Sequence, residues 1–298
     1  MAAEPQVVEQ VESGGAPRPR SLFRHLLRYR SLVFGGGLFA LLVLAAALAP
    51  LLTHYSPDAV NPFATLQGPS AAHWFGTDEL GRDIYTRVLY GARYTIGASI
   101  VAVLIAAVFG TLIGLVAGMA GGYVDLVLMR VVDLILIFPG ILPALAITTI
   151  LGPSLPNVVI AIGLASIPGY ARVVQGTTLQ VKQMNYVESA RASGASSVRL
   201  IFRHVLPSVA SQIIVTGSTG LGVSVLYVAA LGFLGLGVQP PTPELGAMLN
   251  DGRDYILLAW WISFFPGLAI TLYVIAVNLM GDGLRDLFDP HALQRVGR

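Results

Sequence analysis

Residues 95–122 read TIGASIVAVLIAAVFGTLIGLVAGMAGG, and this charge-free apolar stretch decides the fold class. At a rise of about 1.5 Å per residue, a helix of this length can cross the roughly 30 Å hydrocarbon core of a bilayer. Gly110, Gly114, Gly118 and Gly122 recur within it at a spacing of four. Glycine is common in membrane helices in general, but a regular stripe also lets a second helix approach closely. The stretch therefore predicts a membrane-spanning helix with one closely packed face.

The composition of the whole chain agrees with a membrane protein. Only 11% of its 298 residues are charged and 55% are hydrophobic, whereas a soluble domain typically carries about 25% charged residues. So few charges cannot cover a water-facing surface, which excludes a soluble globular fold. The 18 basic residues are spread along the chain rather than gathered in a stripe, so no nucleic-acid partner is expected.

Five other apolar segments are long enough to cross a bilayer, so we predict an all-α integral membrane protein with six transmembrane helices. The predicted spans are residues 33–53, 95–122, 124–150, 157–174, 208–231 and 256–280. Pro139 and Pro143 should bend the third span, and Pro168-Gly169 should kink or break the fourth. A cleavable signal peptide is the alternative for the first span, but its apolar region would be only about 7 to 15 residues long.

The spans divide the chain into five predicted regions. These are a basic cytoplasmic tail (1–30), the first transmembrane helix (31–54), an outer loop with a short helix (55–92), a core domain of five helices (93–285) and a cytoplasmic tail (286–298). Six spans put both termini on one side of the membrane. Placing the N-terminal tail, residues 119–130, residues 172–205 and the C-terminal end from Arg285 on that side gathers 14 of the 18 basic residues there. Cytoplasmic segments carry the excess of Lys and Arg, so both termini are predicted to be cytoplasmic.

Several kinds of chemistry are excluded by the residues present. The chain has no Cys, which removes disulfides, thiolate zinc sites and thiol nucleophiles. Its only Lys, Lys182, lies between Val181 and Gln183, so the Gly-Lys-Ser/Thr of a Walker A loop is absent. Metal-ligand spacing is lacking among the five histidines, His25, His54, His73, His204 and His291. We therefore expect no catalytic residues, no metal site and no resident cofactor.

Residues 185–207, NYVESARASGASSVRLIFRHVLP, are amphipathic and predict a helix, a turn and a second helix. Gly194 can adopt the left-handed conformation that ends the first helix, Ser196 can cap the second, and Pro207 begins the fifth span. One apolar face of the second helix should be formed at i, i+3, i+4 and i+7 by Val198, Ile201, Phe202 and Val205. Either a protein partner or the headgroup region of the membrane could cover that face.

Charged residues within the predicted spans are few. Asp125, Arg130 and Asp133 lie in the first third of the third span, and the spacing of three predicts an ion pair between Arg130 and Asp133. Residues 134–171 contain no charge, so no proton or sodium relay is visible. A secondary transporter would need such a group or broken inverted repeats, and an intramembrane enzyme would need a nucleophile beside a base.

The amphipathic loop carries a family resemblance. Glu188, Ala190 and Gly194, followed by Leu206-Pro207, resemble the EAA loop of permease subunits in binding-protein-dependent ABC importers, although Ser189 replaces the first Ala of the family's pattern. The resemblance implies that residues 184–207 dock into a cleft on a separate ATPase subunit, which would bind the ATP and magnesium. The coupling residues implied are Glu188, Ala190, Gly194, Ile201, Phe202, Arg203, Leu206 and Pro207.

Two further regions narrow the resemblance. Residues 73–83 (HWFGTDELGRD) and 90–93 (YGAR) are similar to the outer loop of the dipeptide, oligopeptide and nickel permease family. Residues 233–241 (FLGLGVQPP) and the motifs within 278–290 are similar to its C-type subunit. A type I ABC importer permease fold in the bacterial cytoplasmic (inner) membrane is thereby implied.

The same resemblance implies the partners and the cargo. The partners would be a second permease subunit in a heterodimer, two ABC ATPase subunits, an extracytoplasmic solute-binding protein and the lipid bilayer. Di- or oligopeptides are the expected cargo, with nickel or another small solute as the alternative, and the residues lining the path stay unassigned.

Each motif also has a purely structural alternative. Thr77 or Asp78 could cap a short surface helix, and Gln239-Pro240-Pro241 must lie outside the membrane or line a protein cavity. A solvated helix end, rather than an ATPase contact, is the structural alternative for Asp282, Arg285, Asp286 and Asp289.

Overall fold

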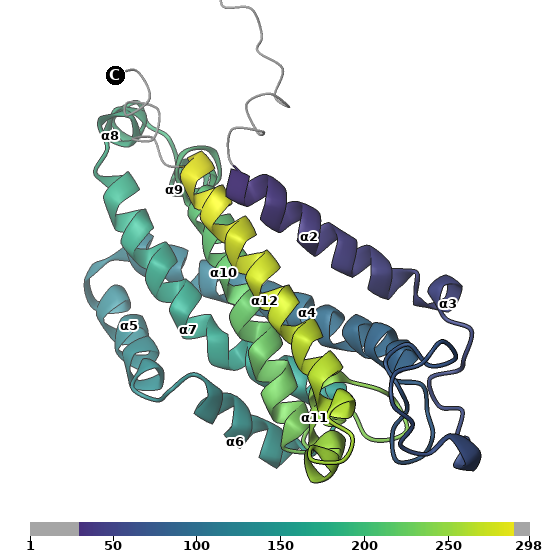
Figure 1. Cartoon of the computed structure of the whole chain (residues 1–298). Helices are drawn as coiled ribbons and strands as arrows, with labels where there is room; N and C mark the ends of the chain where they lie inside the picture. Colours follow the sequence, from purple (N-terminus) through teal and green to yellow (C-terminus); the bar gives the residue numbers. More distant parts are fainter. Residues whose placement is uncertain (1–29, 289–298) are drawn as a thin grey trace, which may run out of the picture.

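The computed structural model describes residues 30–288, which are mostly helical and form no strand (Figure 1). The long elements are α2 (Arg30–Ala47), α4 (Ile84–Ala120), α5 (Gly122–Leu136), α6 (Ile141–Leu151), α7 (Leu155–Lys182), α10 (Leu206–Phe233) and α12 (Trp261–Phe288). The short ones are α3 (Ala49–Leu52), η1 (Pro62–Ala64), α8 (Asn185–Ala192), α9 (Ser197–Leu200), the π-helix η2 (Ile201–Val205), α11 (Leu245–Gly252) and η3 (Arg253–Tyr255). The predicted tails fall almost entirely outside the described residues.

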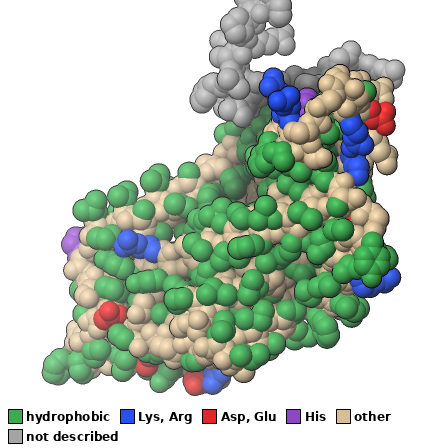
Figure 2. Space-filling view, turned by 180° about the vertical axis from the view of Figure 1, so that it is seen from behind, with side chains coloured by type: hydrophobic (Ala, Val, Ile, Leu, Met, Phe, Trp, Pro, Cys, Tyr) green, Lys and Arg blue, Asp and Glu red, His purple; other side chains and the backbone are tan. Residues whose placement is uncertain are grey.

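The predicted all-α membrane fold is confirmed, and residues 30–288 contain five candidate spans, or six if one bent helix pair counts as a span. Five helical segments are long and apolar enough to cross a membrane: α2, α4, α7, the continuous run Ser197–Phe233, and α12. The pair α5 and α6, which bends by 86° at residues 137–140, passes the same test only when taken together, as a broken span or a re-entrant loop. Pro139 lies in this break, as predicted, because proline cannot donate the next helical hydrogen bond. Figure 2 shows the molecule from behind, and the surface of the helical bundle on this side is formed mainly by hydrophobic side chains, with few charged groups.

The ends of the spans differ from the prediction. α4 begins at Ile84 because Asp83 caps it, its carboxylate accepting from the backbone N–H of Thr86 at 2.8 Å. α7 continues to Lys182 rather than Val174, and it runs through Pro168 without a break. α12 begins at Trp261 rather than near Ile256. Polar residues extend α4 and α7 beyond the apolar runs that alone set the predicted limits, whereas α12 begins later than its apolar run predicted.

α4 and α7 approach each other closely through glycine. A Cβ added to Gly114 would lie 2.6 Å from the carbonyl oxygen of Ala171, and one added to Gly118 would lie 2.7 Å from Cβ of Thr178. A Cβ added to Gly110 would likewise collide with Cβ of Tyr170. The predicted close face is therefore confirmed for three glycines. Gly122 is not part of it, since it has φ +54° and open space around its Cα at the start of α5.

The remaining helices complete the bundle around this pair. α10 packs against α4, α7 and α12, and α2 lies at the periphery along α12 (Figure 1). Gly35 of α2 and Gly283 of α12 make the close contacts of that outer pair. Tyr273 of α12, almost fully buried, donates a hydrogen bond of 2.9 Å to the carbonyl oxygen of Leu42 in α2.

We predict that Gly114→Ala destabilises the protein by about 1 to 3 kcal/mol, because the added methyl group overpacks the α4–α7 contact. Gly97→Ala is the matched control, since a Cβ at this exposed position of the same helix meets nothing within 4 Å. It should be neutral or slightly stabilising, because alanine is the better helix former. Thermal unfolding of the purified chain in detergent measures both, and equal midpoints for the two variants would contradict the glycine contact.

Candidate functional site

Residues 184–207 form a helical hairpin at the end of the molecule where α2 begins and α12 ends (Figure 1). Gly194 follows α8 with φ +83°, and its N–H donates to the carbonyl oxygen of Arg191 at 3.0 Å. Ser196 begins the second helix, its Oγ accepting from the N–H of Arg199 at 3.4 Å. The structure thus contains the helix, the left-handed glycine turn and the capped second helix that the sequence predicted.

The hairpin is attached firmly to the spans on both sides of it. Val187 and Leu200 are buried in one apolar cluster with Val181 of α7 and Val209 of α10. The hydroxyl groups of Tyr186 and Ser208 are 3.2 Å apart. The cluster and this hydrogen bond make the hairpin a continuation of α7 and α10 rather than a loose loop.

The single lysine of the chain has a structural role at the same end. Lys182 Nζ donates to the carbonyl oxygens of Met119 at 2.9 Å and Gly118 at 3.3 Å. These carbonyls belong to the last turn of α4, where the negative end of the helix dipole favours a cation. Lys182 therefore joins the ends of α4 and α7.

The predicted apolar face of the second helix is correct at Val205, which is buried, and at Ile201, which is partly buried. Val198 and Phe202 are instead exposed, at 65% and 67%, and Leu200 is buried in their place. The cause is η2, a π-helical turn over Ile201–Val205. A π-turn holds more residues than an α-turn, so the buried positions are five apart instead of three or four.

The structure divides the predicted coupling residues into two groups. Glu188, Gly194, Arg203 and Pro207 are exposed and Ala190 is partly buried, in or next to the hairpin. Ile201, Phe202 and Leu206 instead line an apolar groove of about 490 Å³ together with residues of α4 such as Leu112 and Val116. Within residues 30–288, ion pairs are not formed by Glu188, Arg191, Arg199 or Arg203. The hairpin thus presents charged side chains outward.

The opposite end of the molecule is a cap built around a buried carboxylate. Asp78 receives Nε of Arg82 at 2.6 Å and lies 3.6 Å from Nε of Arg87, and all three side chains are buried. Arg87 Nη1 also donates to the carbonyl oxygens of Pro57 at 3.0 Å and Pro241 at 3.4 Å. The network ties residues 57–87 to the Gln239-Pro240-Pro241 loop. We predicted that this loop either lies outside the membrane or lines a protein cavity. Its residues are exposed at this end of the molecule, in agreement with the first alternative.

Asp78 is not a helix cap, which corrects the structural alternative proposed for it. The cap of the following helix is Asp83, whose other oxygen lies 2.9 Å from Nδ1 of His73. Thr77 is buried, and its hydroxyl donates to the carbonyl oxygen of Ala64. These side chains serve the folding of the outer loop.

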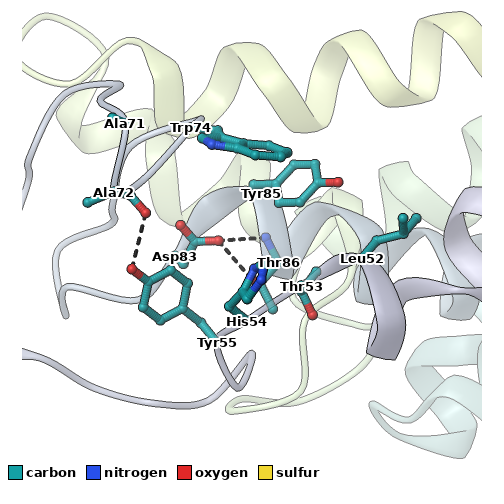
Figure 3. Close-up of a pocket in the computed structure, with 10 residues that line it drawn as sticks. All are labelled: Leu52, Thr53, His54, Tyr55, Ala71, Ala72, Trp74, Asp83, Tyr85 and Thr86. Carbon is teal, nitrogen blue, oxygen red and sulfur yellow. Dashed lines mark hydrogen bonds between the residues drawn. The ribbon is translucent and has the colours of Figure 1, made fainter.

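A pocket of about 280 Å³ opens beside Asp83, at the same end of the molecule (Figure 3). Aromatic side chains, Tyr55, Trp74 and Tyr85, form part of its walls, and the rings of Trp74 and Tyr85 are 4.9 Å apart. Tyr55 donates a hydrogen bond of 3.1 Å to the carbonyl oxygen of Ala72, and the Asp83 carboxylate accepts from Thr86. Because Asp83 is already satisfied by His73 and Thr86, the pocket offers aromatic surface rather than a free charge.

Glu244 is a buried acid that sequence analysis missed. Its carboxylate accepts from the N–H groups of Gly246 at 3.0 Å and Ala247 at 2.9 Å, and from the Thr95 hydroxyl at 2.9 Å. It caps α11 and joins that helix to α4. Burial raises the pKa of Glu244, while the three donors oppose the rise. Glu244 could have been found from the sequence as an acid directly before a short apolar helix. It comes soon after the fifth predicted span, 208–231, and the charge-free residues that follow that span.

The charges of the third span pair differently from the prediction. Asp133 pairs with Arg172 of α7 rather than with Arg130. Asp125 accepts a hydrogen bond of 3.0 Å from Nε2 of Gln175, also in α7. Both acids therefore bind the neighbouring helix, which the spacing along one helix could not reveal.

The bundle of apolar spans, with a charged hairpin at one end and a folded cap at the other, defines a multi-pass membrane protein. Residues 110–294 match the family described as binding-protein-dependent transport system inner membrane component. Residues 20–69 match the N-terminal TM domain of oligopeptide transport permease C. The chain belongs to this family of inner-membrane components and is a C-type ABC importer permease, as the sequence motifs predicted.

Named relatives cover most of the chain. The dipeptide transport system permease protein DppC of Alkalihalophilus pseudofirmus is 44% identical over 91% of this chain and 89% of its own length. The glutathione transport system permease protein GsiD of Pectobacterium atrosepticum is 46% identical over 91% and 90%. Among solved structures, the inward-facing MetNI methionine ABC transporter is similar with a TM-score of 0.56, at 18% identity, over 68% of this chain and 96% of that one. This last similarity supports the fold alone.

We predict that Glu244→Ala lowers the free energy of unfolding by about 2 kcal/mol, because it removes a helix cap and leaves the Thr95 hydroxyl only its longer bond of 3.2 Å to the carbonyl oxygen of Gly91. Asp254→Ala, at an exposed acid nearby, should change it by less than about 0.5 kcal/mol. A double-mutant cycle with Thr95→Val, read by thermal unfolding in detergent, tests the contact itself. Strictly additive effects would contradict the Glu244–Thr95 bond.

Proposed function

We propose that the chain is the C-type permease of an ATP-driven importer of di- or oligopeptides. It would form a heterodimer with a second permease and work with two ATPase subunits and an external solute-binding protein. The observation that carries the proposal is the charged, firmly attached hairpin at residues 184–207. Two relatives named for dipeptide and glutathione transport support a peptide cargo.

The hairpin would lie in the cytoplasm. The N-terminal end of α2 and the C-terminal end of α12 lie at the same end of the molecule as the hairpin (Figure 1). Arg191, Arg199 and Arg203 of the hairpin add to Arg30 and Arg285 there, and cytoplasmic segments carry such an excess. The cap around Asp78 would then face the solute-binding protein.

Coupling would work by rigid-body motion. The hairpin continues α7 at Lys182 and α10 at Leu206 with few residues between, and the apolar cluster of Val187 and Leu200 fixes its angle. An ATPase that holds the hairpin in two positions would therefore move both spans. Such a change requires contacts that differ in strength between the two states. ATP and magnesium would be bound by the ATPase subunits.

We expect Gly194→Val to reduce ATP-dependent uptake more than tenfold. A β-branched residue is strained at φ +83°, at a cost of order 1 to 3 kcal/mol, so the turn between the two hairpin helices should distort. Gly194→Asn is the matched control, because asparagine tolerates the left-handed region and a Cβ there meets no neighbour within 4 Å. Binding of the solute-binding protein should persist in both variants, and wild-type uptake by Gly194→Val would refute the coupling assignment.

The cargo is tested by reconstituting the chain with its partner subunits in proteoliposomes. Labelled dipeptide should accumulate only when ATP and the ATPase subunits are present. Accumulation of Ni²⁺ without that of dipeptide would favour the nickel alternative. Uptake by the chain in the absence of any ATPase subunit would instead indicate a secondary transporter.

A further inference from the structure

A polar pocket of about 500 Å³ lies between α10 and α12 at the hairpin end of the molecule. The two helices lie side by side there (Figure 1). Residues between Ser211 and Thr219 form one wall, and residues between Gly281 and Phe288 form the other. A Cβ added to Gly281 would lie 3.0 Å from Oγ of Ser218, so the helices are in close contact where this glycine lines the pocket.

Two opposite charges line the α12 wall, Asp282 and Arg285. They lie three residues apart, a spacing at which side chains on a helix can pair. Within residues 30–288, however, neither takes part in an ion pair. Both side chains are exposed. The pocket therefore offers one carboxylate and one guanidinium that are both available to a ligand.

The α10 wall adds uncharged polar groups. Gln212 lines it with an exposed side-chain amide, which can both donate and accept hydrogen bonds. The Thr219 hydroxyl donates to the carbonyl oxygens of Thr216 at 3.1 Å and Val215 at 3.4 Å, so its own oxygen is left to accept. A ligand between the helices would thus meet charges on one side and hydrogen-bonding groups on the other.

The hollow and its charge pattern distinguish this site from an ordinary solvated helix end. Asp286 is exposed on the same last turns of α12 but does not line the pocket. Pockets for small molecules commonly measure about 300 to 1,000 Å³, a range that includes this one. A protein surface covering it would have to bring a counter-charge for both Asp282 and Arg285, because an unpaired buried charge is costly. A small zwitterion carries both counter-charges itself.

The spacing of the two charges suits a short peptide. Side chains three residues apart on a helix have Cβ atoms about 5 to 6 Å apart. A fully extended dipeptide spans at most about 7 Å, whereas a tetrapeptide spans up to about 14 Å. The dipeptide can therefore reach both charges with its two termini at once, while an extended tetrapeptide reaches only one.

We propose, on the basis of the importer function above, that this pocket binds a zwitterionic dipeptide on the cytoplasmic side of the transporter. Arg285 binds the C-terminal carboxylate, since a guanidinium matches a carboxylate with two parallel hydrogen bonds. Asp282 binds the N-terminal ammonium group, and the amide of Gln212 bonds the peptide group between them. The pocket is a site for cargo that has crossed the membrane, separate from the outer cap.

The first experiment measures protection of a thiol in the pocket. The chain has no cysteine, so Thr219→Cys introduces its only thiol. In nanodiscs that hold the assembled transporter, a water-soluble methanethiosulfonate should label this chain, and saturating dialanine should slow the labelling at least fivefold. Dialanine acetylated at one end and amidated at the other should not protect. Failure to label the thiol, or equal rates with and without dialanine, would overturn the proposal.

The second experiment tests the two charges in the Thr219→Cys background. Arg285→Gln and Asp282→Asn should each raise the dialanine concentration for half-maximal protection at least tenfold, and tetraalanine should require at least fivefold more than dialanine. Asp286→Asn is the matched control, an identical change outside the pocket, and should stay within twofold. For dialanine amidated at its C-terminus, Arg285→Gln should matter less than twofold, because that peptide has no carboxylate.

Two results would overturn the assignment of the charges. These are equal losses for free and amidated dialanine in Arg285→Gln, and equal effects of Asp282→Asn and Asp286→Asn. Either would mean that the charges act only through the general field of the helix end. Failure of the wild-type importer to take up any peptide with ATP would instead overturn the proposed function, since protection is measured without transport and would stand independently.

Discussion

The close approach of α4 and α7 is the contact on which the rest of the bundle depends. In a membrane, lipid is as apolar as leucine, so helices gain little from apolar contact alone and must gain from close packing. Gly110, Gly114 and Gly118 allow this, because a side chain at any of them would collide with backbone or side-chain atoms of α7. The bond from Lys182 to the end of α4 closes the pair at the hairpin end. The hairpin end of α7 is therefore held against α4, and this fixes the direction in which α8 continues from it.

The two ends of the molecule are held by different kinds of interaction. At the cap, Asp78, Arg82 and Arg87 form a buried ionic network, and Glu244 joins α11 to α4 through Thr95. Taking such charges out of water is costly, and buried ion pairs are weak evidence for stability. Their donors and acceptors are directional, however, so the network sets how the outer loop lies on the spans. At the hairpin the contacts between elements are mainly apolar, and the charged side chains point outward.

Local patterns predicted some parts of this structure well and others poorly. The turn at Gly194 and the cap at Ser196 depend on neighbours within four residues, and both are present. Apolar length predicted that each span exists but not where it ends, because Asp83 and Lys182 extend helices through polar contacts. Asp133 had an equally spaced partner in Arg130, yet it binds Arg172, a choice that only the packing of α5 on α7 decides. The motifs identified the family, whereas Glu244 could be placed only once α11 was seen against α4.

The π-turn at Ile201–Val205 was invisible to periodicity, and it links the hairpin to α10. By inserting extra chain into one turn, it keeps Leu200 and Val205 in the same apolar cluster while Phe202 points outward over the α4–α10 groove. An α-helical turn would rotate Leu200 away from Val181 and Val187, so the hairpin could not be anchored to α7 and α10 at once. π-turns occur frequently at functional positions because their weaker geometry persists only where tertiary contacts require it. Here the requirement is that one short hairpin continues two spans, so any displacement of the hairpin reaches α7 and α10 together.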